Sequence, residues 1–172
     1  MILGPENGTI EVRTYREGLA QKAGHDLIID VAGWKATVGN PEKDPPSSFE
    51  LEVDSRSLQI REGRHGVKPL RDGDRREIRK TIDEKVLRGQ PIVFRSTTVD
   101  RGRKELAVRG ELTLAGITRP ASFELELSAD RRLTGTLNVT QSEWGIKPYR
   151  GLMGALKVRD SVEIVLDVQL PS

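Results

Sequence analysis

The sequence predicts an all-β protein, an eight-stranded antiparallel barrel that is lipocalin-like in form and carries one amphipathic helix near one end. Three observations lead to this fold class. Apolar and polar residues alternate along much of the chain, turn-forming residues interrupt the alternating segments at short intervals, and only one convincing helix is present. An antiparallel sheet with one apolar face must cover that face, and so few helices cannot do so. We therefore expect the sheet to close on itself.

Eight strands are expected, and their limits follow the alternation. They span residues 9–15, 26–38, 49–54, 92–99, 105–114, 122–127, 133–139 and 161–170. The inward positions are expected to include Leu112, Leu125, Leu137 and Ile164, while the residues that precede them, Glu111, Glu124 and Glu163, and Asn138, which follows Leu137, should face water.

One helix is predicted from Asp74 to Leu87. Asp74 is a candidate N-cap, and Glu77 three residues later completes the pattern of a capping box. Ile78, Ile82 and Val86 form an apolar stripe, which suits a helix that lies against one part of a barrel.

Composition limits the organisation and the class of protein. A chain of 172 residues, 35% of them hydrophobic, fits a single domain spanning residues 1–172. A formal net charge of +2 gives no basic surface of the kind that nucleic acids require, and the absence of cysteine excludes disulfides and thiolate chemistry. No export signal and no long apolar segment are visible in the sequence, so a cytoplasmic location is expected.

The filling of the barrel would decide its function, because eight strands can enclose either a solid core or one small ligand. Alternation reports burial and cannot distinguish the two. If the barrel is hollow, its mostly aliphatic inner face favours an apolar guest. The residues expected to line such a cavity are Leu27, Ile29, Phe49, Leu51, Phe94, Leu106, Val108, Leu112, Leu114, Phe123, Leu125, Leu137, Val139, Trp144, Ile164 and Leu166. Head-group contacts are expected from His25, Trp34 and Tyr149.

Four segments of the chain resemble the YceI family. Residues 91–96 read Pro-Ile-Val-Phe-Arg-Ser, and residues 110–120 read Gly-Glu-Leu-Thr-Leu-Ala-Gly-Ile-Thr-Arg-Pro. Residues 142–146 and 160–164 are similar to a later loop and to the closing strand of the family. The resemblance implies a lipocalin-like barrel that binds polyisoprenoids or other amphiphiles. It is weakest over residues 57–87, where relatives often carry Arg-Asp and Phe-Phe-Asp patterns.

The expected function is therefore noncatalytic binding, carriage or sequestration of a long apolar amphiphile, such as a polyisoprenoid, an isoprenoid quinone or a fatty-acyl lipid. Two alternatives remain open: a small-molecule enzyme at the barrel mouth around His25 and Asp26, and a stress-related interaction scaffold with a solid core. No catalytic constellation, cofactor site or metal site is expected, because the two histidines are far apart and no serine has a partner base at a recognisable spacing.

The most basic part of the chain is the segment from residue 56 to residue 88. It holds eleven Lys or Arg residues against six Asp or Glu residues. The simpler interpretation is a solvated loop and helix face, because interspersed carboxylates pair with many of these cations. The alternative is transient contact with an anionic membrane. A homodimer is compatible with the sequence, which gives no oligomeric state.

Overall fold

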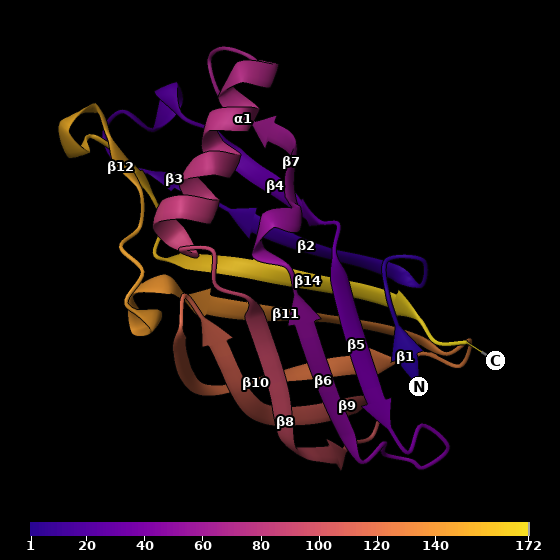
Figure 1. The fold of residues 1–172 in the computed structure, drawn as a ribbon. Helices are drawn as coiled ribbons and strands as arrows, with labels where there is room; N and C mark the ends of the chain where they lie inside the picture. The colour runs from indigo at the N-terminus through magenta and orange to yellow at the C-terminus, as the bar shows by residue number, and fades with distance from the viewer. Residues whose placement is uncertain (172) are drawn as a thin grey trace.

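The fold is built around one strongly curled antiparallel sheet, with a helix lying across one end of it (Figure 1). The computed structural model describes residues 1–171 and does not describe the side chain of Leu152. The helical segment and a small second sheet lie at the same end of the curled sheet, and the β5–β6 and β8–β9 hairpins lie at the opposite end (Figure 1). The all-β class with one helix is thus confirmed.

The curled sheet contains eleven strands in the order β1-β5-β6-β8-β9-β10-β11-β14-β2-β4-β7. Their bounds are β1 (Ile2–Leu3), β2 (Gly8–Thr14), β4 (Asp26–Val31), β5 (Trp34–Gly39), β6 (Ser48–Val53), β7 (Leu58–Arg64), β8 (Ile92–Arg101), β9 (Glu105–Leu114), β10 (Ile117–Leu127), β11 (Arg132–Thr140) and β14 (Ser161–Gln169). The small sheet has the order β12-β13-β3, formed by β12 (Arg150–Gly151), β13 (Leu156–Val158) and β3 (Arg16–Glu17).

The prediction of eight strands in a closed barrel is not confirmed, because the sheet has eleven strands and its pairing order ends at β1 and β7. One reason is a corner in the predicted strand 26–38, which breaks at Ala32 and Gly33 into β4 and β5. The Ala32 N–H donates to the carbonyl of Ser57, and the Asp54 N–H donates to the carbonyl of Gly33. These two bonds hold the corner, and the sheet is best described as a curled half-barrel.

Two further strands, β1 and β7, lie outside the predicted set, and the sequence interpretation assigned β7 to a basic loop. β7 pairs with β4 along its whole length, with Leu58 opposite Val31 and Arg64 opposite Asp26. A short 3-10 turn, η2 (Ser55–Ser57), separates it from β6. Strand alternation is present only in its first half, where Leu58 and Ile60 are buried, and this explains why the strand was missed.

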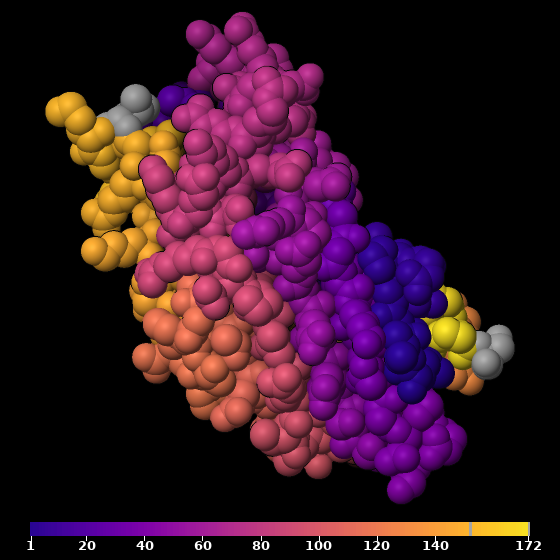
Figure 2. All heavy atoms as spheres, in the orientation of Figure 1, coloured from indigo at the N-terminus to yellow at the C-terminus, as the bar shows by residue number. Residues whose placement is uncertain are grey.

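The helix is displaced from its predicted limits and changes character along its length. Helix α1 spans Asp72–Thr81, and a π-helical turn, η3, continues over Ile82–Val86. Asp74 lies inside the first turn and accepts a 2.9 Å hydrogen bond from the Arg71 N–H, so it is not the N-cap. The predicted stripe of Ile78, Ile82 and Val86 does pack on the sheet side. In the space-filling view, this segment forms a continuous ridge over one end of the molecule (Figure 2).

The predicted alternation of inward and outward residues is confirmed. Leu112 and Leu125 are buried, and Leu137 and Ile164 are partly buried against the core. Glu111, Glu124 and Asn138 are exposed. Glu163 is half-buried because its carboxylate accepts a 2.7 Å hydrogen bond from the Tyr15 hydroxyl.

Buried side chains form two clusters inside the curled sheet. One lies on β8 to β11 around Leu106 and Val108, and the other lies on β1, β2 and β4 to β7 around Ile29 and Val38. Partly buried residues, including Val12 and Ile164, belong to both clusters and connect them. The interior is therefore well packed in places, and space for a ligand exists only where this packing ends.

Candidate ligand cavity

A cavity of about 580 Å³ lies between the sheet, the α1 segment and the small sheet. This volume falls within the usual range for small-molecule pockets. Its sheet side is formed by residues of β2, β4, β8, β9, β11 and β14, and its cover by α1, η3 and the loop before them. The cavity is therefore at the helix-covered end of the half-barrel.

The wall of the cavity is mainly aliphatic. The apolar side chains that line it are Val12, Leu27, Ile29, Leu58, Leu70, Ile78, Ile82, Val86, Leu87, Ile92, Leu114, Val139, Ile146, Leu156, Val158, Val162 and Ile164. Polar groups are fewer and include Thr14, Arg16, His25, Lys68, Asp74, Glu77, Thr81, Gln141, Tyr149 and Lys157. An apolar body with a polar end matches such a lining.

His25 fastens the loop between β7 and α1 at the edge of the cavity. Its Nε2 lies 2.6 Å from the carbonyl oxygen of Lys68. Gly66 of the same loop lies against the imidazole ring, and a Cβ atom at this glycine would fall only 2.1 Å from Nε2. His25 thus lines the cavity, and its Nε2 is already engaged by the backbone.

Asp26 lies next to His25 in the chain and joins three segments. Its carboxylate accepts a 2.9 Å hydrogen bond from the Arg16 N–H and lies 2.8 Å from Nδ1 of His65. Burial opposes ionisation of Asp26, but these contacts outweigh it and hold the pKa of the carboxyl below its ordinary value. The Arg16 guanidinium donates in turn to the carbonyls of Gln21, Gly24 and His65.

Only part of the predicted lining surrounds this cavity. The residues that do are Leu27, Ile29, Leu114, Val139 and Ile164. The others that pack in the interior away from it are Phe49, Leu51, Phe94, Leu106, Leu112, Leu125, Leu137 and Trp144. The remaining three, Val108, Phe123 and Leu166, also belong to the interior cluster and border the outer groove between β10 and β11. Alternation identified inward residues correctly but could not show at which level the interior is empty.

The two tryptophans pack in the core, away from the cavity. Trp144 is buried, and its indole N–H donates a 2.9 Å hydrogen bond to the carbonyl of Leu112. Trp34 is buried in the second cluster at the start of β5, beyond the corner of the sheet. The predicted placement of both residues at the ligand is therefore corrected. Tyr149 lines the cavity mouth and is half exposed.

The cover of the cavity was missing from the predicted lining. A sequence pattern did point to part of this cover, because the helical spacing of Ile78, Ile82 and Val86 predicted an apolar stripe facing the barrel. No sequence pattern pointed to Leu156 and Val158 of β13, since a three-residue strand is too short to show alternation.

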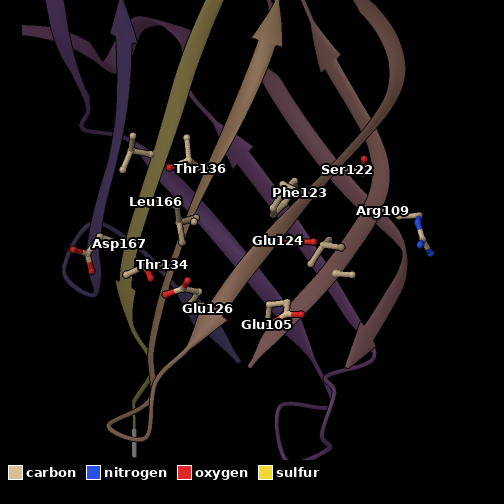
Figure 3. Close-up of a pocket in the computed structure, with 14 residues that line it drawn as sticks. Glu105, Arg109, Ser122, Phe123, Glu124, Glu126, Thr134, Thr136, Leu166 and Asp167 are labelled. Atoms are coloured by element: carbon tan, nitrogen blue, oxygen red, sulfur yellow. The ribbon is translucent and has the colours of Figure 1, made fainter. Parts of the chain in front are cut away.

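The outer groove is larger, about 790 Å³, and lies over β9, β10, β11 and β14 (Figure 3). It forms where β10 and β11 diverge, since they pair only between Leu125–Leu127 and Leu133–Gly135. Glu105, Glu124 and Glu126 surround it, and Asp167 is held by Arg132 at 2.6 Å. Its polar rim and shallow apolar floor suit a lipid less well than the covered cavity does. Among residues 1–171, no cluster of three acidic or histidine side chains could hold a metal ion.

Several cations of the basic segment 56–88 are engaged within the fold. Arg61 bridges Glu11 at 2.6 Å and Asp30 at 2.8 Å. Burial opposes ionisation of Glu11, but hydrogen bonds from Arg61 and Arg13 outweigh it and lower the pKa of this carboxyl. Arg75 donates to the carbonyls of Ile60 and Arg61, which ties α1 to β7. No helix within the described residues is long and apolar enough to cross a membrane.

A curled antiparallel sheet with a covered apolar cavity is the architecture of a binding protein. The chain belongs to the YceI family: the YceI-like domain matches residues 20–170. The fold is similar to that of Burkholderia cenocepacia BcnA, with a TM-score of 0.64 at 15% identity, covering 92% of this chain and 94% of that one. It is also similar to a Campylobacter jejuni YceI protein, with a TM-score of 0.54 at 9% identity, covering 84% and 85%. No curated protein matches the chain significantly.

Proposed function

We propose that the protein binds an apolar amphiphile in the covered cavity and carries or sequesters it without chemical change. The observation that carries this proposal is the continuous aliphatic wall around about 580 Å³ of space. Burying an aliphatic chain there removes apolar surface from water on both partners, at roughly 0.8 kcal/mol for each CH₂ group. Membership of the YceI family supports a binding role.

The enzyme alternative gains no support from the geometry around His25 and Asp26. Nε2 of His25 contacts the Lys68 carbonyl, while the carboxylate of Asp26 contacts His65 and the Arg16 backbone. The two side chains therefore serve different contacts and do not form a base and its orienting partner. The scaffold alternative required a solid core, which the cavity beneath α1 disfavours.

Extraction of the natively purified protein is the direct test. Organic extraction followed by mass spectrometry should release an amphiphile in a molar amount comparable to that of the protein. Delipidated protein should then take up a fluorescent fatty-acyl or prenyl probe. Repeated absence of both a bound lipid and probe uptake would rule out the proposal.

A cavity-filling variant locates the binding site. Leu27 lines the cavity on β4, so Leu27→Trp should place a large ring in the space that the ligand needs. We expect at least tenfold weaker probe binding with circular dichroism unchanged. Leu19→Trp adds the same ring at a fully exposed position and should bind as the parent does. Equal binding by the two variants would place the ligand elsewhere.

A further inference from the structure

We infer that the depth of the cavity limits the length of the acyl chain that it binds, and that its ligand is a single-chain fatty acid of medium length. Long polyprenyl chains would not fit inside it. This inference rests on the proposed function and specifies its ligand. It follows from where the cavity ends inside the half-barrel and from the charged groups at its mouth.

The floor of the cavity lies in register on β2, β4 and β14 and again on β8 and β9, whereas on β11 it begins one residue pair nearer the mouth, because Leu137 is paired with the lining residue Ile164. On each strand, a residue that lines the cavity is followed, two positions further into the half-barrel, by an inward residue that does not. The six pairs are Val12 and Ile10, Ile29 and Val31, Ile92 and Phe94, Leu114 and Leu112, Val139 and Leu137, and Ile164 and Leu166. The agreement between strands shows that the empty space stops at a packed layer.

That layer is closed by large side chains. Ile10 and Leu112 are each 3% exposed, and Phe94 is 5% exposed. The ring of Phe94 packs on that of Phe123 with 5.1 Å between centroids. The layer is also fixed from the side, because the Trp144 indole is hydrogen-bonded to the carbonyl of Leu112. Leu137 and Leu166 complete it as half-buried residues near the outer groove.

The depth above this floor is short. Successive inward residues of a strand lie about 6.6 Å apart, so the two inward levels present on β2, β4 and β14 provide about 13 Å. Those levels are Thr14 and Val12, Leu27 and Ile29, and Val162 and Ile164. An extended fatty-acyl chain of medium length spans such a depth, whereas a longer chain must fold back on itself within the cavity or leave its end in water.

The mouth favours an anionic head group. Lys68 on the loop before α1 and Lys157 on β13 approach the cavity from two separate elements, and neither ammonium group forms an ion pair with a described carboxylate. The Arg16 guanidinium is occupied by backbone carbonyls and by Asp26, 3.6 Å away. Two acidic groups, Asp74 and Glu77, also line this end of the cavity; Asp74 accepts a hydrogen bond from the Arg71 N–H but keeps its negative charge, so a carboxylate ligand must lie on the side of the two lysines.

A series of saturated fatty acids tests the length limit. Displacement of a bound fluorescent probe should be measured for octanoate, decanoate, dodecanoate, palmitate and stearate, and for geranylgeraniol. We expect Kd to tighten about fourfold per added methylene, the equivalent of roughly 0.8 kcal/mol, until the chain reaches the floor, and then to stop improving. Steady improvement through stearate, or tightest binding of geranylgeraniol, would overturn the inference and leave the proposed function standing. Absence of binding by every probe would overturn both.

Two half-buried leucines provide a matched pair for the floor. Leu137→Ala removes part of the floor layer and should move the length optimum toward longer chains. Leu127→Ala removes the same atoms from the far end of the sheet, beside the first cluster, and should leave the optimum unchanged. If Leu137→Ala unfolds the protein, Leu137→Val repeats the test with a smaller change. An unchanged optimum in the folded variant would show that this layer does not limit the chain.

A comparison of decanoate with decanol tests whether the two lysines favour an anionic head group. The parent should prefer the acid by about tenfold, and Lys68→Gln combined with Lys157→Gln should remove that preference without weakening decanol. An unchanged preference for the acid would refute the role of the two lysines.

Discussion

At the scale of single residues, the ion pairs near the cavity mouth make stability depend on pH. Asp26 has a lowered pKa and is mostly shielded from solvent, so its carboxylate contributes stability only when it is ionised. That contribution is complete above the unfolded-state pKa of about 3.9 and is lost as pH falls through the lower folded-state value. Stability should therefore decline in acid.

Asp26→Asn tests this dependence. At pH 7 we expect the variant to lose about 1.5 kcal/mol of unfolding free energy, because a charged acceptor for the Arg16 N–H and His65 becomes neutral. The loss should shrink as pH falls below about 4, because the unfolded parent takes up a proton first and the folded carboxyl takes one up only at lower pH. Urea unfolding at several pH values measures both effects, with Glu17→Gln as an exposed control. A pH-independent difference would contradict the assigned cause.

A second residue-scale prediction concerns neighbours on opposite faces of β10. Leu125 is 5% exposed and Glu124 points to water. Leu125→Asp should lower the free energy of unfolding by about 4 kcal/mol or more, because it leaves an unpaired carboxyl in the apolar core. Glu124→Lys should change it by less than about 0.5 kcal/mol. Equal denaturation midpoints for the two variants would refute the register.

At the scale of elements, the predictability of each segment followed the clarity of its pattern. Strands β9 and β14 alternate over many residues and could be placed from the sequence to within a residue or two. Strand β7 alternates for only three residues before Glu62 and Arg64, whose outward ion pair has no sequence signal. The corner at Gly33 depends on its contact with Ser57, a tertiary feature that local pattern cannot reveal.

The loop between β7 and α1 gives an element-scale prediction. Gly66→Ala would place a methyl group against His25 and should push the loop away from the cavity mouth, lowering stability by about 1 to 3 kcal/mol. Gly73→Ala changes an exposed residue in the first turn of α1, whose nearest side-chain atom is 3.9 Å away, and should be neutral or slightly stabilising. Thermal unfolding and hydrogen exchange across residues 65–70 distinguish the two. Parallel behaviour of both variants would show that the His25 contact does not hold the loop.

At the scale of the whole molecule, the sequence predicted the fold class and the inward faces but not the distribution of empty space. Alternation assigns Leu106 and Ile164 to the same interior. Only the three-dimensional arrangement shows that the first lies in solid packing and the second borders the cavity. The position of α1 over that cavity also depends on Arg75, whose bonds to β7 carbonyls join residues distant in the sequence.

The same placement of α1 yields a prediction about membranes. The guanidinium of Arg75 is hydrogen-bonded to a backbone carbonyl of β7. The cations of α1 that remain exposed beside the cavity are therefore Arg76, Arg79 and Lys80. Each can contribute up to about 1 kcal/mol of attraction to an anionic bilayer, and salt confines this attraction to about 10 Å at 0.1 M. We therefore propose that these three residues speed ligand transfer from anionic vesicles while leaving the equilibrium affinity unchanged.

Stopped-flow transfer of a fluorescent fatty acid measures this rate. Replacing the three residues by Gln should slow transfer about tenfold at low salt and remove most of its salt dependence. The matched control replaces Arg103, Lys104 and Arg131, three exposed cations on the β8–β9 and β10–β11 turns, away from α1, with the same loss of charge. If net charge alone drives the encounter between the protein and the vesicle, transfer will slow equally in both triple variants. A salt-independent rate shared by the parent and both variants would show that the basic helix face is simply solvated.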